Sequence, residues 1–275
     1  MMMIYMRLGE GGMDMKIVVL VKQVPAISDI QIDAKHHNLV RVGAPSMLNP
    51  VDAHAIEASI ALKEALGGTV ILLTMGTALA GEVMRDGIAV GADEGVLISD
   101  ERIAGSDTLA TGKILAKAIE KIGDVDLVLT GKRSTDGDTG QIPPAVAQQL
   151  GISLLSYAES LNIEGRVLTG TRKNHHTLET ISVSLPAVCS VMETINTPRA
   201  PKLRGSMKAK KAVFTVWRLE DLGLTPQDAG TAGSATHVTQ LFAPQPHPTG
   251  MMIDGSSMAE AVHHLIDDLK TKKLI

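Results

Sequence analysis

The sequence predicts a three-layer α/β fold in which helices cover both faces of a doubly wound, mostly parallel sheet. An antiparallel extension of that sheet and a C-terminal arm plus helix are expected to follow. Short apolar runs alternate with amphipathic helical segments as far as Thr130, which is the pattern of a parallel sheet. The first run, Lys16–Val21 (K-I-V-V-L-V), has no polar alternation and is typical of a strand that is covered on both faces.

The elements of the first half follow in a regular order. Asn49-Pro50 predicts a helix start, because asparagine is a favourable N-cap residue and proline suits the first helical position. Gly67-Gly68 predicts the end of that helix. The alternation then continues with a strand at Thr69–Met75, a helix at Leu79–Val90, a strand at Val96–Ile98, a helix capped by Ser106 or Asp107, and a strand at Leu127–Thr130. The segment Gln31–Val42 predicts a small hairpin or loop.

After Leu150 the pattern changes to closely spaced β-rich pieces, which predict antiparallel strands that extend the sheet. Their bounds are Leu161–Ile163, Val167–Arg172, Thr180–Val183 and Ala187–Val191. Gly230–Gly250 is rich in Gly, Pro, Thr and Ala and predicts an arm, and Ser257–Leu269 predicts an amphipathic helix that packs on a partner. We therefore expect an extension at residues 1–14, an α/β domain at 15–225, and an arm with its helix at 226–275.

Composition excludes several classes of function. A net charge of −4 and an aromatic content of 2% argue against nucleic-acid binding, which needs a basic face or stacking platforms. The one cysteine, Cys189, excludes an internal disulfide and a Cys-rich metal site. The adjacent His pairs predict no metal site either, because neighbouring side chains on a strand or helix point in different directions.

Targeting signals are also not apparent. No apolar segment reaches the ~18 residues of a membrane span. The N-terminal residues lack the apolar core of a signal peptide, so we expect a cytoplasmic protein whose translation starts near Met15.

Two polar loops point to a nucleotide site. In Val125–Pro144 an apolar run ends in a loop dense in Gly, Ser, Thr and Asp, and a helix-compatible segment follows. A second such loop, Ala104–Thr111, lies one strand–helix unit earlier. Loops at the carboxyl ends of parallel strands supply N–H groups and hydroxyls that bind phosphate, so we expect the two loops to meet there.

The chain resembles the β subunit of electron transfer flavoproteins from about Met15 to its C-terminus. The motifs that carry the resemblance are K-I-V-V-L-V-K-Q-V-P from Lys16, N-P-x-D-x-x-A-I-E at Asn49–Glu57, G-A-D-E at Gly91–Glu94, L-P-A-V at Leu185–Val188, and N-x-P-R at Asn196–Arg199 followed by M-K-A-K-K at Met207–Lys211. This resemblance implies an adenine-nucleotide-hydrolase-like fold. It also implies a heterodimer with an α subunit that carries a redox FAD.

In this family the β subunit holds either a structural AMP or, in the electron-bifurcating group, a second FAD. The loops D-G-D-T (Asp136–Thr139) and S-D-T-L-A-T (Ser106–Thr111) are similar to those of the bifurcating group. The resemblance therefore implies FAD as the cofactor, with AMP as the alternative. The cofactor-binding residues that we expect are Val21, Gln23, Asn49, Asp52, Thr74, Gly76, Thr108, Thr111, Ser134, Asp136, Gly137, Asp138, Thr139, Gly140 and Gln141.

The residue types suggest different roles within that set. Thr139 and the N–H groups after it can donate to a diphosphate, while Gly137 and Gly140 allow close approach. Asp136 and Asp138 would repel a diphosphate, so we expect them to bind ribityl hydroxyls or to order the loop. Thr108 and Thr111 share one face of a first helical turn and can both point toward phosphate. Asn49 and Asp52 are helix-start residues that can also contact the ligand.

The segment Thr194–Leu203 corresponds to a recognition loop that docks into a partner dehydrogenase in this family. The resemblance implies that Ile195 is its apolar anchor and that Pro198, Arg199 and Leu203 contact the partner. The two prolines suit a preorganised binding loop.

The leading hypothesis is a bifurcating flavoprotein subunit. NADH would reduce the β-bound FAD, one electron would pass through the α-subunit FAD to an acyl-CoA-type dehydrogenase, and the other to ferredoxin or flavodoxin. No residue is expected to act as a catalytic acid, base or nucleophile. The second hypothesis is a plain electron carrier with structural AMP, and the third is a stand-alone nucleotide-binding module. That module would need a glycine-rich ATP loop, which the sequence lacks.

Overall fold

The structure is a computed structural model. It describes residues 14–26, 32–33, 38–39, 45–240, 250, 252–253 and 255–275. The chain divides into two compact units, residues 1–239 and residues 240–275. Each unit is considered by itself. The predicted extension at residues 1–14 lies outside the described residues except for Asp14.

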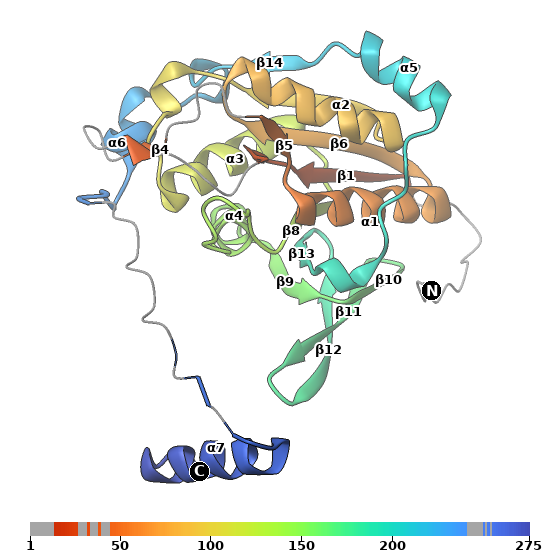
Figure 1. Cartoon of the computed structure of the whole chain (residues 1–275). Helices are drawn as coiled ribbons and strands as arrows, with labels where there is room; N and C mark the ends of the chain where they lie inside the picture. The colour runs from red at the N-terminus through yellow and green to blue at the C-terminus, as the bar shows by residue number, and fades with distance from the viewer. Residues whose placement is uncertain are drawn as a thin grey trace. The chain divides into compact units, whose positions relative to one another are not determined.

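The first unit is built on a seven-stranded sheet with the order β14-β7-β6-β1-β8-β13-β9 (Figure 1). Every neighbouring pair in it is parallel. The strands are β1 (Met15–Leu20), β6 (Gly68–Met75), β7 (Glu94–Ile98), β8 (Leu127–Gly131), β9 (Ser153–Ala158), β13 (Ala187–Val191) and β14 (Thr215–Trp217). The predicted doubly wound α/β fold is confirmed.

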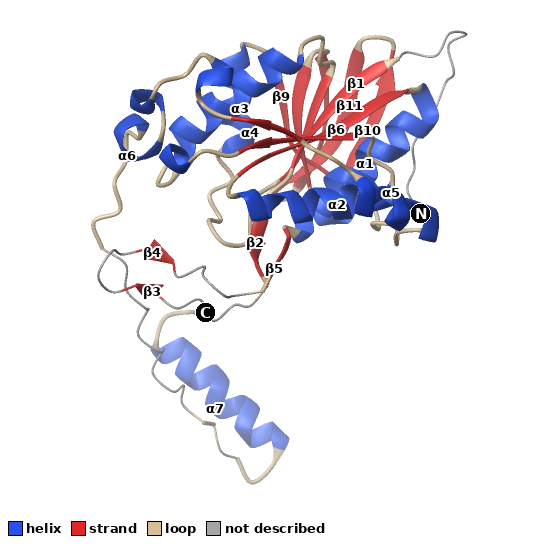
Figure 2. Ribbon diagram, turned by 90° about the horizontal axis from the view of Figure 1, so that it is seen from above, coloured by secondary structure: helices blue, strands red, loops and turns tan. Residues whose placement is uncertain are grey.

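Helices cover both faces of this sheet (Figure 2). On one face lie α1 (Pro50–Leu66), α2 (Gly81–Val90) and α5 (Leu203–Lys211), and on the other lie α3 (Thr108–Ile122) and α4 (Ile142–Leu150). Each face has its own core, because alternate residues of β1 point to opposite sides. Ile17 and Val19 belong to the core under α1 and α2, and Val18 and Leu20 to the core under α3.

Three short sheets lie beside the central one. Strands β2 (Gln23–Pro25) and β5 (Ser46–Leu48) form an antiparallel ribbon, and β3 (Ile32–Asp33) pairs with β4 (Asn38–Leu39) as a small hairpin. The other residues of the predicted Gln31–Val42 segment lie outside the described residues. Strands β10 (Ser160–Glu164), β11 (Val167–Asn174) and β12 (Thr177–Ser184) form a three-stranded antiparallel sheet.

The expected antiparallel extension therefore needs a correction. Strands β10–β12 are antiparallel, but they make their own sheet rather than an edge of the central one, and the β11–β12 hairpin extends beyond it (Figure 1). Ala187–Val191, which we grouped with them, is instead β13, a parallel strand between β8 and β9. The burial pattern gives the reason: every residue of β13 is buried, whereas β12 alternates between exposed and half-buried side chains. A strand covered on both faces belongs inside a parallel sheet.

Other elements were not predicted from the sequence. Strands β9 and β14 and helix α5 are short, and α5 is dominated by basic residues that give no apolar period. The segment expected to be an arm begins with structure as well: the short helix α6 (Gly230–Gly233) follows the 3₁₀ turn η5 (Pro226–Asp228), and both belong to the first unit. The remaining 3₁₀ turns are η1 (Ala78–Ala80), η2 (Glu101–Ile103), η3 (Glu193–Ile195) and η4 (Glu220–Leu222).

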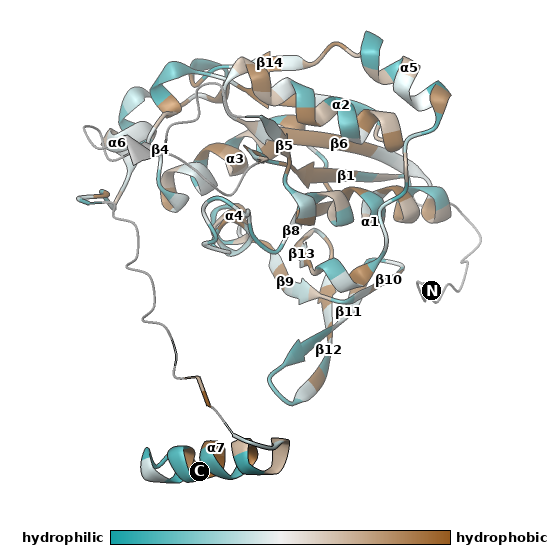
Figure 3. Ribbon diagram, viewed as in Figure 1, coloured by the Kyte–Doolittle hydropathy of each residue, from teal (hydrophilic) through white to brown (hydrophobic). Residues whose placement is uncertain are grey.

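The second unit contains helix α7 (Met258–Thr271), close to the predicted Ser257–Leu269. The Ser257 side chain caps it by accepting a hydrogen bond from the Glu260 N–H. Its apolar side chains Met258, Val262 and Leu265 are exposed. Figure 3 shows hydrophilic and hydrophobic colours together on the α7 ribbon. Across the described part of the chain, no helix has the length and apolarity needed to cross a membrane.

Candidate functional site

The candidate site lies where the strand order of the central sheet reverses. Chain order runs outward from β1 through β6 and β7 on one side, while β8 pairs on the other side of β1. The carboxyl ends of β1 and β8 are therefore adjacent, with Leu20 opposite Thr130. In open parallel sheets, ligands bind at this switch point. Three segments converge there: the residues after β1, the start of α1, and the loop after β8.

Asp52 joins these three segments. From the first turn of α1, its Oδ2 accepts a hydrogen bond from the Lys22 N–H at 2.9 Å, and its Oδ1 accepts one from the Gly131 N–H at 3.2 Å. The residue is only 6% exposed. Desolvation by burial raises the pKa of this carboxyl to about 7, although the hydrogen bonds oppose the rise. Asp52 thus organises the site through its backbone partners.

Asn49 is the N-cap residue of α1 by position, as predicted, but its side chain makes no capping hydrogen bond. Instead its Nδ2 donates to the Arg133 carbonyl at 3.0 Å, and its Oδ1 accepts from the Thr135 N–H at 3.2 Å. The buried side chain therefore holds the loop after β8 against the start of α1. The expectation of a capping side chain was therefore wrong. The Arg133 carbonyl and the Thr135 N–H take up the Asn49 side-chain amide, which leaves it no hydrogen bond for the helix N–H groups.

Lys22 was not among the predicted site residues. Its ammonium group donates to Ser134 Oγ at 3.2 Å and pairs with Asp136 Oδ1 at 2.7 Å. The Asp136 side chain is 2% exposed, whereas that of Lys22 is 42% exposed. Asp136 therefore orders the loop, one of the two roles that we considered for it. Lys22 could have been found from the sequence, because it directly follows an apolar strand and the loops after parallel strands carry site residues.

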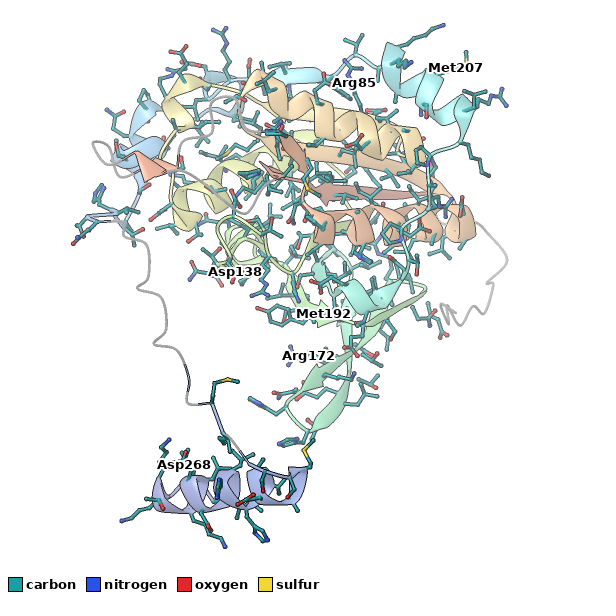
Figure 4. All side chains as sticks on the ribbon, viewed as in Figure 1. Arg85, Asp138, Arg172, Met192, Met207 and Asp268 are labelled. Atoms are coloured by element: carbon teal, nitrogen blue, oxygen red, sulfur yellow. The ribbon has the colours of Figure 1, made fainter. Side chains whose placement is uncertain are left out.

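The tip of the loop after β8 is open to solvent. Asp138 has a φ of +51° and pairs with Arg133 at 2.9 Å, and Figure 4 shows it at the outer edge of the loop before α4. Among the described residues no hydrogen bond engages the N–H groups of Gly137, Thr139 and Gly140. These three donors are available to an anionic ligand.

Gly140 has a φ of +62°, which favours glycine, and a Cβ there would lie 3.2 Å from the Tyr157 hydroxyl. Tyr157 is also in the left-handed region, at φ +61°, and its N–H donates to Ser190 Oγ at 3.0 Å. Sequence reasoning did not find this aromatic residue at the site; it lies on β9 where the register with β13 shifts.

The second loop meets the first, as predicted. Asp107 caps α3 by accepting a hydrogen bond from the Ala110 N–H at 2.9 Å. Thr108, the first residue of that helix, donates from Oγ1 to Gln141 Oε1 at 2.7 Å. The start of α3 is thereby tied to the start of α4. Thr111 follows one turn later and is half-buried.

The remaining predicted ligand residues lie at the carboxyl ends of β1 and β6. Val21 is buried, and its N–H donates to the Leu73 carbonyl. Gln23 donates from Nε2 to Ser46 Oγ at 2.7 Å, which joins β2 to β5. Gly76 starts the turn after β6, and its N–H donates to the Ile98 carbonyl. Thr74, the next-to-last residue of β6, differs from these because its buried Oγ1 has no hydrogen-bond partner among the described residues.

The predicted recognition segment is fixed on α1. Ile195 is 6% exposed and belongs to the core beneath α1 and α2, so a partner cannot cover it in this conformation. Arg199 forms a double ion pair with Glu57 at 2.9 Å and Glu64 at 2.6 Å, and these carboxylates hold its pKa above the ordinary value. Pro198 and Leu203 are exposed. Ile195 is thus the buried residue of the set, whereas the ion-paired Arg199 side chain is 32% exposed.

The site is suited to binding rather than to acid–base chemistry. Its donors are backbone N–H groups, hydroxyls and the Lys22 ammonium, all of which suit phosphate oxygens. Its carboxylates, Asp52, Asp136 and Asp138, are each engaged by loop groups. In the described part of the chain, no three His, Cys, Asp or Glu side chains lie together in a way that could hold a metal ion.

Known proteins are similar to this chain over most of its length. A family model for the electron transfer flavoprotein domain matches residues 37–222. The caffeyl-CoA reductase-Etf complex subunit CarD of Acetobacterium woodii is 39% identical over 95% of this chain and 100% of its own length. An electron transfer flavoprotein subunit beta of Megasphaera elsdenii is 36% identical over the same shares. Protein FixA of Azorhizobium caulinodans is 36% identical over 90% of this chain and 91% of its own.

Proposed function

The chain belongs to the electron transfer flavoprotein family, as a β subunit, and on that premise we propose that it works in a heterodimer with an α subunit and that the complex bifurcates electrons. The similarity to CarD, a subunit of a reductase-Etf complex, supports the bifurcating assignment over a plain carrier. The relatives match over almost their full lengths, which argues against a stand-alone nucleotide module.

We propose FAD as the cofactor of the switch-point site, and the residues there fit it. The unpartnered Thr74 hydroxyl is a buried polar group that a ligand atom could satisfy. The N–H groups of Gly137, Thr139 and Gly140 fit a diphosphate, and the loops that carry Thr108 and Gln141 already meet beside them. When bound, FAD supplies hydride acceptance and one-electron chemistry that side chains lack.

The chain's own residues supply binding and orientation. Asp52 and Asn49 hold the loop after β8 in place, and Lys22 adds a positive charge beside it. Opposite charge and oriented N–H groups favour the anionic diphosphate over other ligand parts. Lys22 also donates a hydrogen bond to Ser134 Oγ. Val21, Gln23, Thr74 and Gly76 lie at the carboxyl ends of β1 and β6. The protein would therefore orient the nucleotide with its diphosphate against the loop after β8.

The complex is proposed to oxidise NADH and to pass the two electrons on separately. One would go by way of the α-subunit FAD to an acyl-CoA-type dehydrogenase, and the other to ferredoxin or flavodoxin. The chain contains no G-x-G-x-x-G sequence, so the NADH site would be formed against the cofactor and partly by the α subunit. The alternative remains a carrier whose β subunit holds AMP.

The first experiment is to measure the FAD and AMP content of the complex purified with its α subunit. Two FAD per heterodimer without AMP supports the proposal. One FAD with one AMP makes the protein a plain carrier and overturns it.

A variant then locates the site. Asp138→Ala with Thr139→Ala should remove the second nucleotide and leave the α-subunit FAD bound, since it removes the Arg133–Asp138 ion pair at the loop tip and the Thr139 hydroxyl donor. The matched control is Asp124→Ala, an exposed aspartate that also has a φ of +51° but lies just before β8, at the opposite end of that strand. Unchanged nucleotide content in the double variant would reject the site.

A further inference from the structure

Lys132 is a largely buried lysine to which the proposed function gives no role. It directly follows β8, and its side chain is 16% exposed. The ammonium group pairs with Glu193 Oε2 at 2.8 Å, and the Lys132 N–H donates to the Val191 carbonyl at 3.0 Å. The Lys132 carbonyl oxygen lies 3.5 Å from the place that a Cβ would take at Gly140. Lys132 therefore contacts both the glycine turn of the loop after β8 and the chain that leaves β13.

The chain that leaves β13 continues as the predicted recognition segment, Thr194–Leu203, and α1 holds it at two further places (Figure 1). His54 Nδ1 lies 3.1 Å from the Asn196 carbonyl oxygen and 3.0 Å from Asn196 Oδ1, so this ring nitrogen carries a proton and donates it. The Asn196 amide donates in return to the His54 carbonyl at 2.9 Å. Arg199 follows with its ion pair to Glu57.

The same supports carry the nucleotide site. Lys132 stands between Gly131, whose N–H donates to Asp52, and Arg133, whose carbonyl accepts from Asn49. Asn49 and Asp52 belong to the start of α1, directly before the part of that helix that holds the recognition segment. The loop after β8 and the recognition segment therefore rest on the same two structures, which are Lys132 and the N-terminal half of α1.

The ion pair between Lys132 and Glu193 is the direct link between the two regions. Burial raises the pKa of Glu193, but the hydrogen bond from Lys132 and the positive charges of Lys132 and the nearby His54 ring hold it below its ordinary value. A recognition segment that moved away from this position would leave the Lys132 ammonium without its counter-charge in a largely buried place, which is costly. The ion pair thus favours the segment as it stands.

We propose that Lys132 is a positioning residue that couples the two regions, so that a nucleotide bound by the loop after β8 stabilises the recognition segment in the conformation described here. A ligand that accepts from the N–H groups of Gly137, Thr139 and Gly140 restricts the glycine turn against which Lys132 lies. The ion pair with Glu193 passes this restriction on to the segment. By reciprocity, a segment held in place strengthens nucleotide binding by the same factor. The inference rests on the proposed function, because that function supplies the nucleotide.

Hydrogen exchange of the complete α–β complex tests the coupling without electron flow. The probes are FAD and AMP, each added separately after the nucleotide of the β subunit has been removed. The amides of Ile195 and Arg199 are the reporters, since the first donates to the Met192 carbonyl and the second to Glu57 Oε2. Filling the site should slow their exchange in the wild type by about fivefold or more.

Lys132→Gln is the variant that removes the link, because it takes away the charge and keeps a polar side chain. In this variant the nucleotide should change the exchange of the two amides by less than about twofold, and its dissociation constant should rise by the factor that the coupling has lost. Lys132→Arg keeps the positive charge and should restore the response. Glu193→Gln should act as Lys132→Gln does, and the double variant should add no further effect.

Lys117→Gln is the matched control, because Lys117 is an exposed lysine of α3 that is paired with Glu120. It should leave the response to nucleotide unchanged. If Lys132 only supports the fold, its loss would speed exchange equally in the empty and the filled complex, and the difference between them would persist. That result overturns the inference, and so does a wild-type complex that binds nucleotide without any change in the two amides.

Failure of the proposed function gives a different result in the same experiment. A complex that takes up AMP but not FAD refutes the bifurcating assignment, while slower exchange of the two amides with AMP still supports the coupling. A complex that takes up neither nucleotide in its β subunit overturns both.

Discussion

At the scale of single residues, the site depends on side chains that bind the protein's own backbone. Asp52 accepts from the N–H groups of Lys22 and Gly131, and Asn49 bridges Arg133 and Thr135. Neither is free to bind a ligand with all its polar atoms. A buried polar group that is fully paired is costly to replace, because its partners are left unsatisfied.

Asp52 also makes stability depend on pH. Its pKa is about 7 in the folded protein against an ordinary value of 3.8, so the folded state binds the proton more tightly. Its contribution to stability is fully present below pH ~4 and is lost as the pH rises through about 7, by at most about 1.4 kcal/mol per pH unit. Urea unfolding of the wild type between pH 5 and pH 8 measures this.

Asp52→Asn is the matching variant. It cannot titrate, and its NH₂ group faces one of the two backbone donors, which costs about 1–3 kcal/mol. The stability difference from the wild type should be largest at pH 5 and smallest at pH 8. A difference that does not change with pH would contradict the assignment.

Ile195 gives a second prediction at this scale. Because the side chain is 6% exposed within the core, Ile195→Ala should lower the free energy of unfolding by about 2–4 kcal/mol. Thermal and urea unfolding measure the loss. Pro198→Ala, at an exposed position of the same segment, serves as the control. A loss below about 0.5 kcal/mol would mean that the side chain is not packed as described.

At the scale of elements, close backbone contact fixes α5 to α2. Gly205 is required there, since a Cβ would meet the Ala89 carbonyl oxygen at 2.0 Å. Gly205→Ala should therefore loosen α5, even though alanine favours an isolated helix by about 1 kcal/mol.

Hydrogen exchange of the α5 amides gives the measurement. Their protection should fall in Gly205→Ala and stay unchanged in Ser206→Ala, the neighbouring substitution. If alanine at 205 instead increases protection, helix propensity dominates and the contact with α2 is weaker than described.

At the scale of the whole molecule, the chain consists of a packed α/β unit and a short C-terminal unit that contains helix α7. A 14-residue helix is marginal in water by itself, and the exposed Met258, Val262 and Leu265 give α7 an apolar side to bury. We expect this unit to gain its stability from the α subunit.

Truncation after Thr239 tests this expectation. The shortened chain should keep its melting temperature within about 2–4 °C, because the first unit has its own two cores. Association with the α subunit, measured by analytical ultracentrifugation, should weaken at least tenfold. A truncated chain that binds the α subunit as tightly as the full chain would exclude the role of α7.

Much of the fold followed from local pattern. The alternation of apolar runs and helical segments up to Thr130 predicted β1, β6, β7 and β8 and the helices between them, because each strand is covered on both faces. The two polar loops were predicted to meet, and the contact between Thr108 and Gln141 confirms it. That contact is predictable because carboxyl ends of parallel strands share one edge.

What the sequence determined by itself was the order of elements, the loops at the strand ends and the family to which the motifs belong. Only the tertiary structure decided that β13 lies inside the sheet, that Lys22 and Tyr157 reach the site, and that Ile195 is buried while α5 presents Leu203 and Met207 to solvent. The physical reason is the sequence separation over which each kind of interaction acts. Periodicity and capping act within a few residues, whereas strand pairing, burial and ion pairing depend on neighbours that only folding brings together.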